Sequence, residues 1–393
     1  MKRMTGLIVA VMLLAVTVAA QAYDGPVEKK TFSMPAYTTV GGQTIKSVRI
    51  GYETYGTLNA ARDNVILIGH GFSGNSHAAG KYKAADPAPG YWDSIIGSGK
   101  PVDTDKFFVI ATDSLVNLNV KDPTVVTTGP ASINPATGRP YGLSFPIVTI
   151  RDFVNVQKAL LDSLGITRLR AAMGPSMGSI QSFEWAAAHP DMVQRVIAVI
   201  PTAELDAFTI GWANIWAQPI MLDPRWNNGD YYGKDEHTAG LAASLKIVTL
   251  HARHYGWADK AFGRKWAAPD RDPARALGNK FAIEAVLEQA AMARAKISDA
   301  NSFLYLVKAN QLFVTGHKGT LEGGLADVKA KVLLLPAQSD LLLFPDYAKR
   351  VKAILEKQGK PVEYFEIEGD GGHLDGAFLI TKAGEVIRKF LSQ

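Results

Sequence analysis

The sequence predicts an α/β protein with a mostly parallel central sheet flanked by helices and a helical cap inserted between late strands. The first observation is that short apolar runs alternate with helical segments between Tyr23 and Ile200. The second is that strand-like runs disappear from about Thr202 to Glu322 and then return in two late segments. Alternation of this kind favours a parallel sheet covered by helices, and the long helical stretch before the last strands favours an inserted cap.

Each predicted element has its own local signal. Apolar runs predict strands at 48–55, 65–68, 107–112, 169–173, 196–200, 332–336 and 362–367. A helix is expected at 152–164, because Phe153, Val156, Leu160 and Leu161 follow helical spacing and Gly165 is a typical helix stop. The stretch 128–146 is rich in proline and glycine and is expected to be one long ordered loop.

These elements divide the chain into four parts. Residues 1–22 are predicted to be a signal peptide, 23–201 the first part of the α/β core, 202–325 the helical cap, and 326–393 the second part of the core. Helices in the cap are expected around 239–250, 282–295 and 303–313. The cap is also rich in tryptophan, and we expect most of these side chains to be buried and a few to line a substrate cleft: Trp212, Trp216, Trp226, Trp257 and Trp266.

The N-terminus has the pattern of a cleavable secretory signal. Two basic residues precede an uncharged run from Leu7 to Val18, and Ala20-Gln21-Ala22 is a small-x-small cleavage site before Tyr23. The apolar run is shorter than the roughly 20 residues that a membrane span needs, which favours cleavage over an anchor. We therefore expect a periplasmic or secreted protein with no stable membrane span after cleavage.

Composition narrows the classes of function. The chain has 393 residues, of which 47% are hydrophobic and 20% charged, and this suits a large buried core. It has no cysteine, so disulfides, thiol nucleophiles and cysteine metal sites are excluded. The formal charge of +5 is small and scattered, which gives no support for binding to nucleic acid.

No cofactor or metal is expected. No glycine-rich phosphate-binding motif follows a predicted strand, so no nucleotide cofactor is implied. His251 and His254 lie at i, i+3 spacing in a predicted helix and superficially resemble a metal pair. Without a third ligand or an H-E-x-x-H pattern, a solvated or packed histidine pair is the better interpretation.

The segment Gly174-Pro175-Ser176-Met177-Gly178 lies between an apolar run and an amphipathic one and matches the nucleophile elbow G-x-S-x-G. A serine hydroxyl is a poor nucleophile, so the chain must turn sharply to present Ser176 Oγ to a base. The flanking glycines let the backbones of helix and strand pass close to that turn. The motif therefore predicts serine-dependent acyl transfer.

An acid and a histidine follow the last two predicted strands, in the order in which an α/β-hydrolase carries them. Asp340 follows 332–336 and His373 follows 362–367. We expect His373 to take and return the Ser176 proton, and Asp340 to fix the tautomer of His373 and stabilise its imidazolium. A helix cap at Asp340 and a surface histidine at His373 are the structural alternatives. Asp370 and Asp375 flank His373 and are alternative acids, although neither lies beyond the preceding strand.

The early strand opens into Gly69-His-Gly-Phe-Ser-Gly74, where this fold supplies one donor of the oxyanion hole. The backbone N–H groups of Phe72 and Met177 are the candidate donors, helped by the N-terminus of the helix after Ser176. His70 is expected to be structural rather than a base.

Beyond the elbow, the chain resembles the homoserine O-acetyltransferase family of α/β-hydrolases. The resemblance covers most of the mature sequence and lies in HGFSGNSHAAG (70–80) and in 90–96, 105–110, 128–134, 145–152 and 335–340. It implies the α/β-hydrolase fold, acetyl transfer to L-homoserine, and a homodimer through the cap. Under this resemblance Ser176, Asp340 and His373 match the family's triad.

Two positions depart from the family pattern. Leu245 stands where the similar cap helix usually carries an arginine that holds the amino acid carboxylate, and Leu374 follows His373 where an aspartate is usual. Acetyl-CoA is a cytosolic metabolite, so an exported enzyme would need a different acyl donor. The sequence therefore predicts an exported serine esterase that acts on a small-molecule carboxylic ester and passes the acyl group from Ser176 to water.

Two other functions are left open. Homoserine O-acetyltransferase activity, with acetyl-CoA as donor, is favoured by similarity along the whole chain. A catalytically silent binding protein would keep the cleft, but the complete set of Ser176, Asp340 and His373 argues against it.

Overall fold

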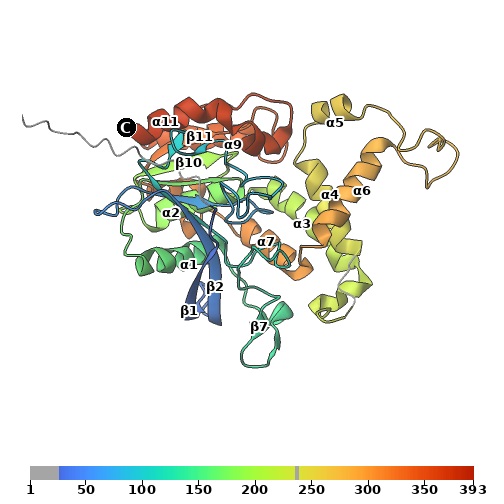
Figure 1. The fold of residues 1–393 in the computed structure, drawn as a ribbon, viewed down its shortest axis with the longest axis horizontal. Helices are drawn as coiled ribbons and strands as arrows, with labels where there is room; N and C mark the ends of the chain where they lie inside the picture. The colour runs from blue at the N-terminus through green and yellow to red at the C-terminus, as the bar shows by residue number, and fades with distance from the viewer. Residues whose placement is uncertain (1–25, 235–238) are drawn as a thin grey trace, which may run out of the picture.

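A computed structural model describes residues 26–234 and 239–393, and Figure 1 shows how its elements are arranged. The predicted signal peptide, 1–22 with cleavage before Tyr23, lies outside the described residues. The described chain forms an eight-stranded sheet in the order β1-β2-β6-β3-β9-β10-β11-β12. Helices cover both faces of this sheet, and a group of helices lies to one side of it.

The strands of this sheet are short and mostly parallel. They are β1 (Lys30–Thr38), β2 (Thr44–Tyr55), β3 (Val65–Gly69), β6 (Phe108–Thr112), β9 (Ala171–Pro175), β10 (Arg195–Val199), β11 (Lys331–Leu335) and β12 (Val362–Tyr364). From β6 to β12 each neighbouring pair is parallel, whereas β1 pairs with β2 and β2 with β6 in the antiparallel sense. The predicted fold class, a mostly parallel sheet flanked by helices, is confirmed.

Two local features differ from the prediction. β1 was not expected, and it pairs along its length with β2 at the edge of the sheet. The stretch 128–146 is not a plain loop, because it contains a small antiparallel pair, β7 (Ile133–Asn134) with β8 (Arg139–Pro140), and a 3₁₀ turn at Gly142–Ser144. A second short pair, β4 (Ile96–Gly97) with β5 (Val102–Asp103), precedes β6.

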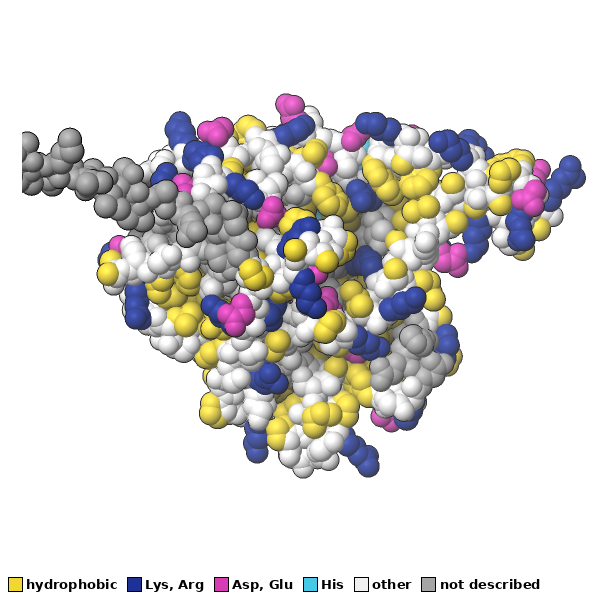
Figure 2. All heavy atoms as spheres, in the orientation of Figure 1, with side chains coloured by type: hydrophobic (Ala, Val, Ile, Leu, Met, Phe, Trp, Pro, Cys, Tyr) yellow, Lys and Arg dark blue, Asp and Glu magenta, His cyan; other side chains and the backbone are white. Residues whose placement is uncertain are grey.

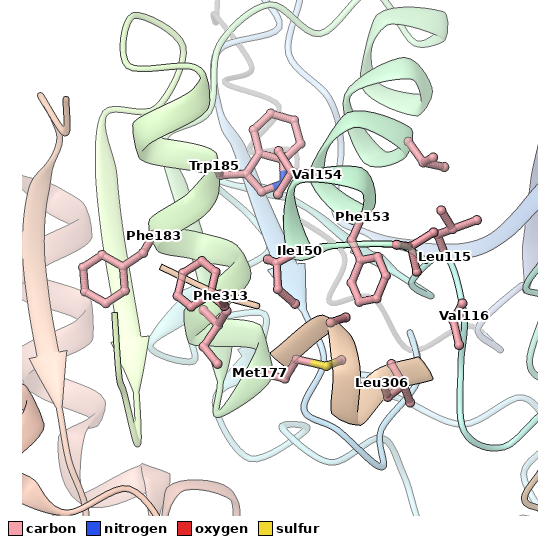
Figure 3. Close-up of a cluster of buried hydrophobic side chains, with 14 of the residues drawn as sticks. Leu115, Val116, Ile150, Phe153, Val154, Met177, Phe183, Trp185, Leu306 and Phe313 are labelled. Atoms are coloured by element: carbon pink, nitrogen blue, oxygen red, sulfur yellow. The ribbon is translucent and has the colours of Figure 1, made fainter. Parts of the chain in front are cut away.

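The sheet separates two hydrophobic cores. Val65 and Leu67 of β3 point into one core and Ile66 and Ile68 into the other, as the alternation of side chains along a strand requires. The first core is closed by α1 (Ile150–Ser163), α2 (Met177–Ala188) and α9 (Pro345–Lys357), and the second by α11 (Gly384–Ser392). Figure 3 shows side chains of α1 and α2, with Leu306 from α7 (Ala300–Gln311), meeting in the first core.

Helix α1 illustrates how sequence produces one of these elements. Thr149 caps the helix and exchanges hydrogen bonds with Asp152, which forms a capping box. Asp152 Oδ1 also accepts a hydrogen bond from Tyr37 Oη of β1 at 2.7 Å, so the buried carboxylate joins the helix to the edge strand. Phe153 and Val156 face the core, as their spacing predicts.

The chain between β10 and β11 is helical. It contains α3 (Ala207–Leu222), α4 (Ala239–His251), α5 (Tyr255–Ala261), α6 (Ala282–Ala295), α7 (Ala300–Gln311) and α8 (Leu321–Ala326). We call helices α3 to α7 the cap; α4, α5 and α6 lie on the right of Figure 1 and α7 lies nearer its centre. Helix α3 packs on α4 and α7, and α4 packs on α6. Helix α8 instead packs against α2 and α9 of the core. A short helix, α10 (Asp375–Phe378), lies between β12 and α11.

The cap exposes apolar side chains. Phe208, Met221 and Leu222 of α3 and Met292 of α6 are each at least half exposed, and Figure 2 shows hydrophobic side chains gathered over the cap. None of the helices in the described part of the chain is long and apolar enough to cross a membrane.

Candidate functional site

Ser176 occupies a strained turn between β9 and α2. Its φ of 56° and ψ of −119° lie where residues with a Cβ are rarely found. The turn is tight because a Cβ at Gly174 or Gly178 would come within 2.5 or 2.2 Å of the Gly69 carbonyl oxygen. Only glycine therefore allows β9 and α2 to pass so close to β3. The Ser176 N–H donates to the Val199 carbonyl at 2.9 Å, which ties the turn to β10.

Asp340 lies on the loop after β11 and is buried. Its Oδ1 accepts hydrogen bonds from the backbone N–H groups of Leu342 at 2.8 Å and Leu343 at 3.0 Å. Its Oδ2 lies 2.6 Å from His373 Nδ1. A carboxylate accepts only, so His373 Nδ1 carries the proton in this contact, and Nε2 is left as the nitrogen able to act as a base.

The other two acids near His373 have different partners. Asp370 is exposed and forms an ion pair with Lys260 at 3.6 Å. Asp375 accepts from the Gly371 N–H at 3.0 Å and the Ser339 hydroxyl at 3.3 Å, and burial raises the pKa of its carboxyl. Neither makes a hydrogen bond with His373 in the described structure. The geometry therefore pairs His373 with Asp340, and Asp375 holds the loop that carries His373.

Two cavities meet at Ser176. The larger cavity has a volume of about 440 Å³, and Ser176, His373, Leu374 and Arg294 are among the residues that line it. The smaller cavity has a volume of about 50 Å³ and is lined by Ser176 and Met177 of the core together with cap residues. The residues common to both cavities are Phe72, Ser176, Trp216 and Leu342. Ser176 therefore borders two cavities of different volume.

The predicted oxyanion donors lie beside Ser176. Phe72 and Met177 both line the smaller cavity with Ser176. In the described structure neither backbone N–H donates to another residue, and Met177 begins α2, where the helix dipole favours negative charge. Both N–H groups are thus available to a developing oxyanion.

His70 holds the loop that carries Phe72. Its Nε2 accepts from the Ser114 backbone N–H at 3.1 Å, and its Nδ1 lies 2.7 Å from the Gly71 carbonyl oxygen. This arrangement requires a neutral ring with the proton on Nδ1. Burial lowers the pKa of His70, in agreement with that state. His70 is buried away from both cavities, so its position is that of a structural residue.

The two cap histidines occupy different places. His251 lines the smaller cavity, where its Nδ1 accepts from Trp216 Nε1 at 3.2 Å and its ring lies 4.1 Å from that of Trp212. Burial and the neighbouring His373 lower the pKa of His251. His254 caps α5 by accepting from the Gly256 N–H at 3.1 Å. Within the described residues no cluster of histidine and acidic side chains is arranged to hold a metal ion.

Sequence reasoning did not single out Arg294 or assign His251 to a cavity. Both lie on cap helices whose neighbours in sequence are mostly apolar, and only the packing of α4 against α6 brings Arg294 to the larger cavity. The expectation that most of the cap tryptophans are buried is wrong, because of the five only Trp226 is buried, where it donates to Asn301 Oδ1 at 2.8 Å. Trp212 and Trp216 line the smaller cavity, as expected of a few of these side chains.

The two leucines that depart from the family pattern differ in location. Leu245 is fully buried between the cap helices and lines neither cavity. Leu374 lines the larger cavity directly after His373.

The geometry has counterparts among known proteins. The family described as alpha/beta hydrolase fold matches residues 64–377. Homoserine O-acetyltransferase of Carboxydothermus hydrogenoformans is 38% identical over 372 residues, which cover 93% of this chain and 96% of that protein.

Two solved structures are similar over nearly their whole length. The crystal structure of esterase E22 has a TM-score of 0.89 and 51% identity and covers 93% of this chain and 100% of that one. The structure of homoserine O-acetyltransferase from Bacillus anthracis has a TM-score of 0.90 and 39% identity, with 94% and 98% covered. The similar proteins thus include both acyltransferases and esterases.

Proposed function

Because the chain belongs to the α/β-hydrolase fold family, in the branch that includes the homoserine O-acetyltransferases, and is an acyl-transfer enzyme of that type, we propose that it acts through an acyl-Ser176 intermediate. The observation that carries this proposal is the hydrogen bond of His373 to Asp340 beside the cavity that Ser176 also lines. Ser176 is the nucleophile, His373 the base and Asp340 the residue that orients it. The backbone N–H groups of Phe72 and Met177 form the oxyanion hole.

The proposed reaction has two halves. Ser176 Oγ attacks the carbonyl carbon of the ester while His373 Nε2 takes the hydroxyl proton. The tetrahedral oxyanion is stabilised by the two N–H groups, and the bond to the alcohol oxygen then breaks as His373 returns the proton to that oxygen. An acceptor hydroxyl next attacks the acyl-serine and loses its proton to His373. The bond between the acyl carbon and Ser176 Oγ then breaks as His373 returns that proton to Oγ, and Ser176 is regenerated.

The acceptor distinguishes two candidate functions. The curated relatives are named homoserine O-acetyltransferase, and these names favour transfer to homoserine over the hydrolysis that the sequence analysis put first. Hydrolysis is favoured by the resemblance to esterase E22 and by the larger cavity, whose lining is mostly apolar and places Leu374 beside His373. We propose water as the acceptor and keep homoserine as the second candidate.

Product analysis decides between the two. The purified protein is incubated with p-nitrophenyl acetate, and separately with acetyl-CoA, in the presence of L-homoserine, and products are identified by mass spectrometry. Free acetate alone supports water as acceptor, whereas O-acetylhomoserine supports the transferase.

In both reactions Ser176→Ala is expected to lower the rate by roughly 10⁴-fold or more, because it removes the nucleophile. Ser163→Ala, at an exposed serine far along α1, is the matched control and should keep the wild-type rate. Acyl transfer that survives Ser176→Ala would contradict the proposal.

Two further parts of the proposal concern location and assembly. The N-terminal pattern supports export, and a periplasmic fraction should contain a chain whose N-terminal sequence begins at Tyr23. The apolar side chains exposed on the cap support a homodimer, which light scattering would report as twice the monomer mass.

A further inference from the structure

Arg294 brings a positive charge to the larger cavity, and no acidic side chain of the described residues pairs with it. It lies in the last turn of α6, and the described structure records three hydrogen bonds from its guanidinium. These go to Thr249 Oγ1 at 2.6 Å, to Ser73 Oγ at 2.7 Å and to the Leu245 carbonyl oxygen at 3.5 Å. All three acceptors are neutral, and a guanidinium carries more N–H donors than these acceptors engage.

The surroundings leave this charge uncompensated. Among the described residues no aspartate or glutamate lines the larger cavity, and Arg294 forms no ion pair there. Burial lowers the pKa of Arg294. Arginine nevertheless stays protonated in proteins, so the cavity holds a fixed positive charge. A cation in the last turn of a helix is stabilised by the helix dipole. That effect does not explain why the guanidinium is hydrogen-bonded to Ser73.

Arg294 also lies in the cavity that contains His373. Ser73 belongs to the loop that carries Phe72, so the guanidinium is hydrogen-bonded to that loop and lines the same cavity as Ser176 and His373. The larger cavity contains His373, which must return its proton to the alcohol oxygen, while the smaller cavity contains Met177 and not His373. The alcohol portion of the ester therefore occupies the larger cavity and the acyl portion the smaller one.

We propose that the enzyme acts on short-chain acyl esters of hydroxy acids, whose carboxylate binds Arg294 in the larger cavity. This inference rests on the proposed acyl-Ser176 mechanism. A carboxylate matches the planar N–H fork of a guanidinium. The same cavity offers no described carboxylate side chain to an ammonium group, so a simple hydroxy acid fits better than a hydroxy amino acid.

The test compares three acetyl esters with one carbon chain. γ-Acetoxybutyrate carries the carboxylate, γ-acetoxybutyramide replaces it with a neutral amide, and O-acetylhomoserine adds an ammonium group. Acetate release gives kcat/KM for each. We expect the wild-type protein to prefer γ-acetoxybutyrate over the amide by about ten- to hundredfold, the range of a charge-assisted hydrogen bond, and to prefer it over O-acetylhomoserine as well.

Variants assign the preference to Arg294. Arg294→Gln keeps hydrogen-bond donors without the charge and should bring the acid-to-amide ratio close to one, whereas Arg294→Lys should keep part of it. Lys296→Gln removes an equal charge from an exposed position outside both cavities and should keep the wild-type ratio. Circular dichroism verifies that each variant is folded.

The possible failures are distinguishable. A wild-type ratio near one, or a ratio that Arg294→Gln leaves unchanged, overturns the role of Arg294. Cleavage of p-nitrophenyl acetate without cleavage of any of the three esters overturns the substrate class and leaves the acyl-Ser176 mechanism intact. Absence of Ser176-dependent turnover with every ester and with acetyl-CoA instead overturns the proposed function itself.

Discussion

The smaller and larger cavities at Ser176 share Trp216 and border α4, but the rest of their walls differ. The smaller one, about 50 Å³, is closed by Trp212 and Trp216 of α3 and His251 of α4. The larger one, about 440 Å³, is bordered by α4, by Arg294 of α6 and by the loop of His373. The first suits a short apolar group and the second a larger group with a negative charge.

The catalytic residues and the residues that select the substrate come from different parts of this molecule. Ser176, Asp340 and His373 come from loops at the ends of core strands, where the rigid sheet holds them. The inserted helices supply most of the wall that belongs to the smaller cavity alone, and they supply Arg294 to the larger one. A change in the core should therefore affect all substrates alike, and a change in the cap should affect one side of the ester.

The largest effect should come from a core residue that lines neither cavity. Asp340→Asn is expected to lower kcat by about 10³–10⁴-fold, because an amide no longer holds His373 in the tautomer that leaves Nε2 free. The loss should be the same for acetyl, butyryl and hexanoyl esters, as measured by steady-state kinetics.

Asp375→Asn is the matched control for that variant. Asp375 supports the loop of His373 through Gly371 and Ser339 and has no hydrogen bond to the imidazole, so we expect a loss of less than about tenfold. A larger loss for Asp375→Asn than for Asp340→Asn would show that the acid had been misassigned.

An intermediate effect should come from widening the smaller cavity. Trp212→Ala removes an indole from its wall and should raise the ratio of kcat/KM for hexanoyl over acetyl esters by tenfold or more. The reason is that each methylene buried contributes about 0.8 kcal/mol, or about fourfold in rate.

Trp266→Ala, at a partly exposed tryptophan outside both cavities, should leave the acyl-chain ratio unchanged. If Trp212→Ala instead changes the preference between γ-acetoxybutyrate and its amide, the two cavities have been assigned to the wrong halves of the ester.

The smallest effect concerns pH. Burial lowers the pKa of His251 below its usual 6.5, so on acidification His251 gains its proton later than an ordinary histidine. We expect His251→Gln to keep the acid limb of the kcat/KM profile within about 0.3 pH units of wild type. A limb that vanishes or moves by a full unit would show that His251 is itself a titrating group on which activity depends.

Some elements could be predicted because their signals are local. Apolar runs placed β3, β9 and β11 within a few residues, and Phe153 with its helical neighbours placed α1. β1 was missed because alternate side chains along it are exposed and its residues have no continuous apolar run. Its place at the edge depends on pairing with β2, which is a contact between strands and not a property of either segment.

The sequence by itself determined the sharp turn at Ser176, since Gly174 and Gly178 are required by the approach of Gly69, and it determined the order of Ser176, Asp340 and His373 along the chain. The order along the chain favoured Asp340 as the acid, and the tertiary structure decided against Asp370 and Asp375 by placing Asp340 Oδ2 2.6 Å from His373 Nδ1. It also decided which cap side chains face Ser176. Arg294 and His251 come from helices whose packing angle sets their direction, and no pattern within either helix encodes that angle.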